Sequence, residues 1–169
     1  MSASERPWLL IDVDGVLNPL MVADDFELHE LRPIGWTGPP LTVQLTPRHG
    51  EWITALTDVF DLVWATTWEQ SANLLISPIV GLPTDLPVIP FVEPRLRHDW
   101  EVSFKSPSVA RWVEGHSFVW LDDSIGAADT RWFEKVTGVG PFLLRSIDPL
   151  VGLTEADCAV AREWGESLR

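Results

Sequence analysis

The sequence predicts an α/β fold of three layers, in which a parallel β-sheet is flanked by helices on both faces. Short apolar segments, typical of buried strands, alternate along the 169 residues with amphipathic segments that are typical of helices. Two of the apolar segments, 8–11 and 117–121, run directly into acidic residues, Asp12-Val13-Asp14-Gly15 and Asp122-Asp123. Because parallel strands end together at one edge of a sheet, where open α/β folds bind ligands, we expect these acids to lie close together.

Each expected element has its own local signal. Apolar runs predict strands at 8–11, 62–65, 117–121 and 141–145, with shorter strands at 41–45 and 88–91. The first helix is expected to begin with Thr46 as its N-cap and Pro47 at its first position. Further helices are expected at 68–76, ending before Pro78, at 106–113, at 129–136 with Asp129 as a cap, and from Thr154 onward.

The segment between the first strand and the first helix, 19–46, is interpreted as a flap or hairpin beside the site. It lacks a sustained helical period and is rich in proline and glycine between Pro33 and Pro40. It is too short for a second domain, so we expect a single domain over 1–169. The apolar fraction of 46% favours a packed core over disorder.

The charge balance narrows the classes of partner. Acidic residues outnumber basic ones by 25 to 12, and the net charge of −13 disfavours strong non-specific binding to nucleic acid or anionic membranes. Cys158 is the only cysteine, which excludes an intrachain disulfide and a thiolate metal cluster. The sequence has neither a signal-peptide pattern nor a run long enough to span a membrane, so a cytoplasmic protein is expected.

Three predicted strands end in polar residues that share one chemistry. The residues are two pairs of acids, a pair of hydroxyls and a lysine that precedes a helix: Asp12, Asp14, Thr66, Thr67, Lys105, Asp122 and Asp123. Carboxylates are preferred ligands of Mg²⁺, and an ammonium group and a hydroxyl can hold phosphate oxygens. An aspartate that is free to attack phosphorus would divide a difficult hydrolysis into two easier steps. The pattern therefore predicts phosphoryl transfer with Mg²⁺.

The order of these motifs resembles that of the haloacid dehalogenase (HAD) superfamily. The similarity rests on Asp12-Val13-Asp14-Gly15, Thr66, Lys105 and Asp122-Asp123, and covers most of the chain. The inserts after the first motif and before Lys105 are short, so the chain resembles a member without a large cap. The segments Trp64–Trp68 and Trp120–Asp123 are most similar to a small bacterial subgroup that includes HAD domains of RNA-repair proteins.

The resemblance implies a role for each residue. Asp12 would be the nucleophile and a metal ligand, and Asp14 would be the general acid and base, with its backbone carbonyl as a metal ligand. Lys105 would stabilise the charge of the nucleophile and intermediate. Asp123 would bind Mg²⁺ directly, and Asp122 directly or through water. Thr66 would bind the phosphoryl group, with Thr67 as the alternative one residue further on, and Arg95 and Arg97 are substitutes for Lys105.

The activity implied is a Mg²⁺-dependent phosphomonoesterase acting on a phosphorylated small molecule, a nucleotide or a nucleic-acid end. Two alternatives stay open: an end-processing phosphatase or phosphotransferase for nucleic acid, and a catalytically silent domain that binds a phosphorylated ligand. A response-regulator receiver is disfavoured because its acid pair and phospho-acceptor lie on different strands, whereas here the Asp12-Val13-Asp14 motif opens the chain. Trp36, Trp68 and Trp100 fall near predicted loop or site positions, where an indole could stack on a base, but packing or loop anchoring is favoured for each.

Overall fold

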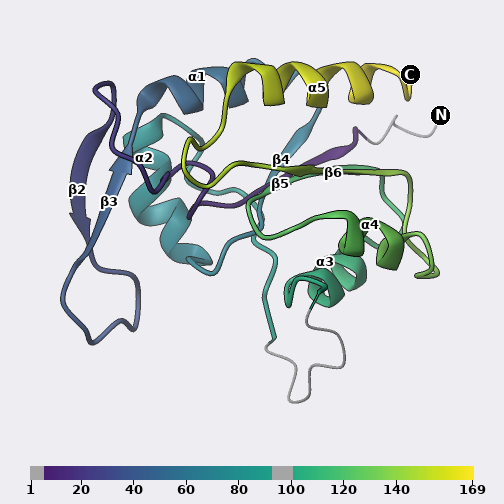
Figure 1. The fold of residues 1–169 in the computed structure, drawn as a ribbon, viewed down its shortest axis with the longest axis horizontal. Helices are drawn as coiled ribbons and strands as arrows, with labels where there is room; N and C mark the ends of the chain where they lie inside the picture. The colour runs from purple at the N-terminus through teal and green to yellow at the C-terminus, as the bar shows by residue number, and fades with distance from the viewer. Residues whose placement is uncertain (1–5, 93–100) are drawn as a thin grey trace.

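The computed structural model describes residues 6–92 and 101–169, which contain a four-stranded parallel sheet (Figure 1). The strands are β1 (Trp8–Ile11), β4 (Asp61–Trp64), β5 (Phe118–Asp122) and β6 (Phe142–Ser146), in the order β4-β1-β5-β6. Every neighbouring pair in this sheet is parallel. The predicted α/β parallel sheet is therefore confirmed, and β1 lies between β4, which precedes Thr66 and Thr67, and β5, which ends at Asp122.

Alternate side chains of the strands pack into two hydrophobic clusters, one on each face of the sheet. Leu9 and Ile11 of β1 belong to the cluster that contains Ile53 of α1 (Pro47–Thr54) and Ala161 of α5 (Glu155–Glu166). Leu10 belongs to the cluster with α3 (Ser106–Val113) and α4 (Ala127–Phe133). Figure 1 shows α1 and α5 above the sheet and α3 and α4 below it. Burial on both faces explains why the strands are apolar throughout rather than alternating with polar residues.

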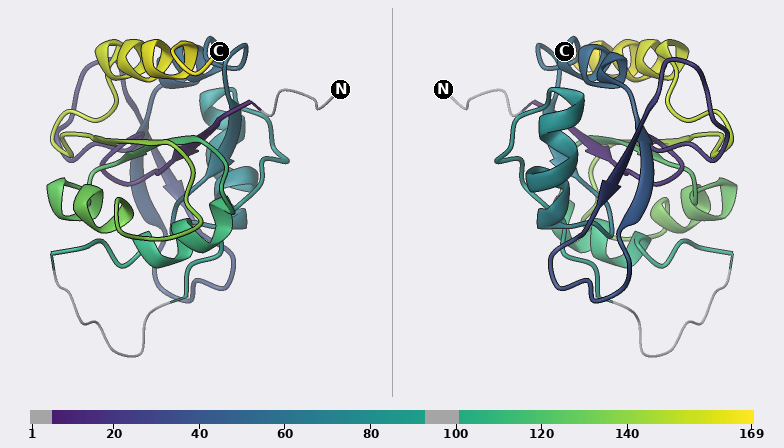
Figure 2. Two further views of the ribbon diagram at one scale, coloured as in Figure 1. Left: turned by 90° about the vertical axis from the view of Figure 1, so that its right-hand side faces the viewer. Right: turned by 90° about the vertical axis from the view of Figure 1, so that its left-hand side faces the viewer.

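The segment after β1 contains an antiparallel hairpin of β2 (Glu27–Leu31) and β3 (Leu41–Leu45). Two views show it beside the helical segment that follows β4 (Figure 2). The buried Gln44 side chain of β3 attaches the hairpin to the loop after β1, because its Nε2 donates to the carbonyls of Pro19 (2.7 Å) and Met21 (2.8 Å).

Some element boundaries differ from the sequence-based expectation. The helix expected to end before Pro78 instead continues as a π-helical turn, η1 (Ala72–Ile76), and then as α2 (Ser77–Val80). Pro78 lies in the first turn of α2, where its missing N–H costs no intrahelical bond, and Gly81 ends the helix in the left-handed conformation. Of the short strand expected at 88–91, Val88 forms an isolated bridge to Trp64.

The helix expected from Asp129 begins earlier, at Ala127, with Gly126 as its N-cap. Asp129 is the third residue of the helix and caps it by accepting a hydrogen bond from the Gly126 N–H at 3.0 Å. None of the helices in the described ranges is long and apolar enough to cross a lipid bilayer.

Candidate active site

The strand register brings three chain segments to the same edge of the sheet. Ile11 of β1 pairs with Trp64 of β4 on one side and with Leu121 of β5 on the other. The Asp12 N–H donates to the Leu121 carbonyl (3.1 Å), and the Ala65 N–H donates to the Ile11 carbonyl (2.8 Å). The residues that follow these strands are therefore neighbours, as the sequence pattern predicts.

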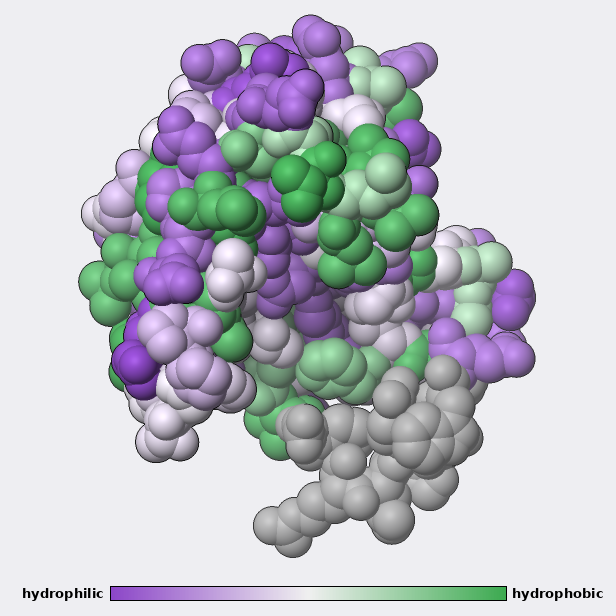
Figure 3. All heavy atoms as spheres, turned by 60° about the vertical axis from the view of Figure 1, so that its left-hand side comes forward, coloured by the Kyte–Doolittle hydropathy of each residue, from purple (hydrophilic) through white to green (hydrophobic). Residues whose placement is uncertain are grey.

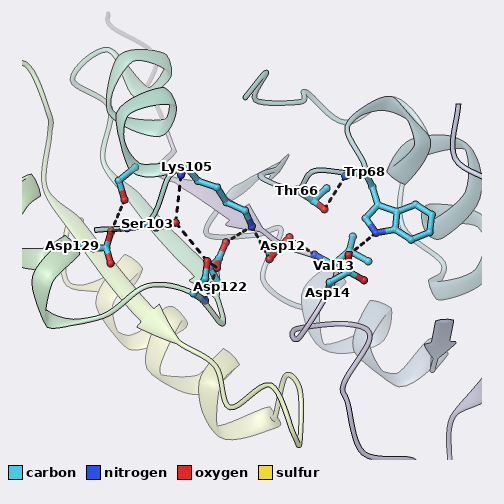
Figure 4. Close-up of polar contacts among 11 residues, drawn as sticks. Asp12, Val13, Asp14, Thr66, Trp68, Ser103, Lys105, Asp122 and Asp129 are labelled. Atoms are coloured by element: carbon cyan, nitrogen blue, oxygen red, sulfur yellow. Dashed lines mark hydrogen bonds and ion pairs between the residues drawn. The ribbon is translucent and has the colours of Figure 1, made fainter. Parts of the chain in front are cut away.

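Lys105 connects the acids of β1 and β5. Its Nζ lies 2.7 Å from Asp12 Oδ2 and 2.7 Å from Asp122 Oδ2, and all three side chains are buried. Figure 4 shows the lysine reaching from the start of α3 toward the two carboxylates. Of the predicted site residues, Lys105 has the weakest local signal, and the structure brings it into contact with both acids. Arg95 and Arg97, its sequence-based substitutes, lie outside the described residues, as does Trp100.

Three carboxyl groups of the cluster lie near a single ammonium group. Burial raises the pKa of Asp12, and the nearby charge of Asp122 raises it further against the opposing effect of Lys105. Burial alone would lower the pKa of Lys105, but the charges and hydrogen bonds of Asp12 and Asp122 raise it above its ordinary value. Burial and the charge of Asp122 also raise the pKa of Asp123. One ammonium group thus leaves these carboxylates incompletely neutralised.

The donor set of this cluster fits a divalent cation. Asp12, Asp122 and Asp123 each offer a carboxylate oxygen, and these oxygens lie within 4.8 Å of one another. Gly15 lets the Asp123 carboxylate approach the first loop, because a Cβ at position 15 would overlap that side chain. Gly15 also has a φ of +76°, a conformation that other residues adopt at a cost. Oxygen ligands in this number suit Mg²⁺, which keeps several of its waters.

Asp14 differs from the other acids in its surroundings. Its side chain is exposed and points away from Lys105 toward Trp68 (Figure 4). The Trp68 Nε1–H donates to Asp14 Oδ2 at 2.9 Å, and the Asn18 amide donates to Oδ1 at 3.0 Å. Asn18 also accepts a hydrogen bond from the Gln44 N–H at 2.9 Å, which connects the Asp14 loop to the hairpin. Asp14 is thus held at the rim of the cluster.

The two threonines occupy different environments. Thr66 is fully buried where β4 ends, and its hydroxyl accepts a hydrogen bond from the Trp68 N–H at 3.3 Å, which leaves its own hydrogen free to donate. Thr67 is exposed and lines a surface cleft with Asp14. Either position leaves a hydroxyl near the edge of the sheet, so the choice between them stays a prediction.

Sequence reasoning missed how several residues hold the cluster in place. The Ser124 N–H (2.8 Å) and hydroxyl (2.7 Å) both donate to Asp122 Oδ1, which leaves Oδ2 to Lys105. Asp129 Oδ1 accepts from the Ser103 N–H (2.8 Å) and the Ser106 hydroxyl (2.6 Å), so that α4 holds the segment that carries Lys105. A serine two residues after an acid is a weak Asx-turn signal, and the contacts of Asp129 have no local signal.

The space-filling view shows the surface on the hairpin side of the molecule. Hydrophilic residues lie in a hollow that is flanked by hydrophobic side chains (Figure 3). A polar hollow with apolar walls is typical of sites that orient a small ligand.

Comparison with known proteins agrees with this geometry. A family model described as the HAD domain in Swiss Army Knife RNA repair proteins matches residues 8–158, nearly the whole chain. The searches against curated proteins and against solved structures returned no match. The family match contains β1, β4 and β5, and with them every predicted site residue. The chain therefore belongs to the family of HAD domains found in Swiss Army Knife RNA repair proteins.

Proposed function

We propose that this HAD domain is a Mg²⁺-dependent phosphomonoester hydrolase that works through an aspartyl-phosphate on Asp12. The observation that carries the proposal is the position of Lys105 Nζ, 2.7 Å from both Asp12 and Asp122, with Asp123 in the same cluster. A buried ammonium group beside a carboxylate at the open edge of a parallel sheet can neutralise a phosphate that approaches that carboxylate.

The cation would be held by the carboxylates of Asp12 and Asp123, by Asp122 directly or through water, and by the backbone carbonyl of Asp14. When bound, Mg²⁺ would supply positive charge to the phosphoryl oxygens and so lower the energy of the transition state. The incomplete neutralisation of the acids by Lys105 supports this assignment, since a second positive charge would remove the remaining repulsion among them.

The protein's own residues perform two displacements at phosphorus. Asp12 attacks phosphorus, the bond to the ester oxygen breaks, and Asp14 gives its proton to the leaving oxygen. Asp14 then accepts a proton from water, whose oxygen attacks phosphorus and displaces Asp12, releasing inorganic phosphate. Lys105 and a threonine hydroxyl stabilise the charge in both steps. The exposed rim position of Asp14 suits this role, because the leaving group must stay accessible to solvent.

A second candidate function is phosphatase or phosphotransferase action at the end of an RNA strand. It is favoured by the family description, which places the related domains in RNA repair proteins. The net charge of −13 weighs against a long track along the RNA backbone, since such tracks depend on clustered Lys and Arg. Recognition would then be confined to the terminal nucleotide.

The test is the release of phosphate from p-nitrophenyl phosphate with and without Mg²⁺, in the wild-type protein and in Asp12→Asn. Asp85→Asn, which changes an exposed acid outside the cluster, is the matched control. We expect Mg²⁺-dependent turnover that Asp12→Asn abolishes and Asp85→Asn retains. Absence of such turnover on this substrate, on nucleotides and on phosphorylated oligonucleotides would reject the hydrolase and favour a silent phosphate-binding domain.

A further inference from the structure

A surface cleft adjoins the rim of the active site between the hairpin and the segment after β4. Its volume is about 380 Å³, within the range of small-molecule sites. The lining residues are Asp14, Thr67 and Trp68 on one side, and the hairpin residues Pro33, Ile34, Gly35, Trp36 and Leu41 on the other. Asp14 lines this cleft and also protonates the leaving oxygen in the proposed reaction. A substrate whose leaving oxygen lies at Asp14 would therefore extend its leaving group into the cleft.

The hairpin loop is held in a defined shape by hydrogen bonds. The Ile34 N–H donates to the buried Ser71 hydroxyl (2.9 Å), which attaches the loop to the segment after Trp68. Within the loop, Arg32 donates to the Gly38 carbonyl (2.7 Å) and the Trp36 N–H to the Pro33 carbonyl (3.1 Å). Such a loop presents its side chains without a large ordering cost on binding.

Trp36 is fixed in orientation and yet exposed. Its indole Nε1–H donates to the Pro39 carbonyl at 2.8 Å, and the ring packs so closely on Gly38 that a Cβ there would overlap it. The side chain nevertheless remains 45% exposed, and its neighbour Ile34 is 66% exposed. An anchored indole at the mouth of a cleft, beside further apolar surface, is typical of a ligand-binding surface rather than of core packing.

The charge of the cleft restricts what it can bind. Among the described residues that line it, Asp14 is the one charged side chain, and the remaining side chains are apolar or hydroxyl-bearing. A second phosphate would find no cation in this lining, whereas a flat, neutral ring could stack on the Trp36 indole. Trp68 packs, as the sequence favours, and does not offer its ring to a base, because it is only 6% exposed and its Nε1–H is bonded to Asp14.

We propose that this cleft binds the base of a nucleotide whose phosphate is held at Asp12, with the base stacked on Trp36. The proposal rests on the proposed hydrolase and names its substrate class. A nucleotide joins a phosphate monoester to a planar, uncharged ring. Its phosphate would lie at Asp12, its ester oxygen at Asp14 and its ring in the cleft. The shared chemistry is a terminal nucleotide, either free or at the end of a strand.

The test compares hydrolysis of adenosine 5′-monophosphate, adenosine 3′-monophosphate and glycerol phosphate by the wild-type protein, Trp36→Ala and Trp36→Phe. Base stacking predicts that the preference for a nucleotide over glycerol phosphate falls roughly tenfold in Trp36→Ala and is largely kept in Trp36→Phe. Leu28→Ala, an exposed hairpin residue that is not part of the cleft lining, is the matched control and should keep the preference. Phosphorylated oligoadenylates, run in parallel, separate a strand end from a free nucleotide as the preferred source.

A binding measurement separates this proposal from the hydrolase itself. Calorimetric binding of adenosine monophosphate to Asp12→Asn should weaken roughly tenfold in the Asp12→Asn, Trp36→Ala double variant. Trp36-dependent binding, together with a wild-type protein that releases no phosphate from any of these substrates, would reject the hydrolase and retain the base site. An unchanged nucleotide preference in Trp36→Ala, in a protein that hydrolyses both kinds of substrate, would overturn the base site and retain the hydrolase.

Discussion

Two parts of the same sheet edge contain acids that differ in almost every physical respect. Asp12 and Asp122 are buried and share one lysine, whereas Asp14, two residues from Asp12, is exposed and bonded to neutral donors. The buried part is an electrostatic centre, where charges interact strongly because water is excluded. The exposed part faces solvent and the cleft. The difference supports the proposal that the buried part would hold the phosphate and that the exposed part would handle the leaving group.

The largest effect on stability and activity is expected from removing the positive charge of Lys105, which Asp12 and Asp122 share. Lys105→Met leaves two carboxylates buried without their cation, which should cost about 3–5 kcal/mol of unfolding free energy and abolish turnover. Urea denaturation and a phosphatase assay measure the two effects. Lys135→Met, which removes an exposed lysine of the same length, should change neither. Full stability in Lys105→Met would mean that the buried part is not an electrostatic centre.

The role of the exposed part is tested through the leaving group. Asp14→Asn should slow hydrolysis of an alkyl phosphate by roughly 10²–10⁴-fold, the usual contribution of a general acid. The effect on p-nitrophenyl phosphate should be smaller, because nitrophenolate leaves readily without a proton.

Trp68→Phe should reproduce this selective loss at a smaller size, about tenfold, because it removes the N–H that orients Asp14. The ratio of the two rates is compared within one protein sample, so a lower stability of the variant cancels. An equal loss on both phosphates would show that Trp68 acts through packing alone.

The close approach of Gly15, which follows Asp14, to Asp123, which follows Asp122, is tested by substitution of the glycine. Gly15→Ala forces an L-residue into a left-handed conformation and also pushes a methyl group into Asp123. Gly81→Ala makes the same backbone change at φ +81° with no atom within 4 Å of the new Cβ. Gly81→Ala should cost about 1–2 kcal/mol, and Gly15→Ala should cost more and also weaken Mg²⁺-dependent activity. Equal stability and activity in the two variants would contradict a close contact between Gly15 and Asp123.

The smallest effect is expected at the support of Asp122. Ser124→Ala removes one hydroxyl donor to Asp122 Oδ1 but keeps the backbone N–H, so it should cost about 1 kcal/mol. Ser146→Ala, at an exposed position of β6, is the control in the same urea titration and should be neutral. A loss as large as that of Lys105→Met would show that the Ser124 hydroxyl stabilises Asp122 as much as Lys105 does, and would contradict the central role of the lysine.

The division between the two parts also explains what the sequence could and could not predict. Strand ends and buried runs follow local rules, and these rules alone are enough to place Asp12 and Asp122 at one edge of the sheet. The partners of Asp14 depend on where the loop after β4 directs the Trp68 indole, and no sequence pattern encodes that direction. Pro78 shows the limit of a local rule, because proline ends a helix from within but is tolerated in its first turn.

The central claim is that Asp12 is the nucleophile of the buried centre, and trapping its phosphorylated form tests this most directly. Asp14→Asn slows the second displacement, so the protein should accumulate the phosphoryl group when it is mixed with Mg²⁺ and a ³²P-labelled aryl phosphate and quenched in acid. We expect the label on the peptide that contains Asp12 and no label in the Asp12→Asn, Asp14→Asn variant. Hydroxylamine should release the label as inorganic phosphate and leave a hydroxamate, as it does with an acyl phosphate. Label on another residue, or undiminished turnover in Asp12→Asn, would contradict the assignment.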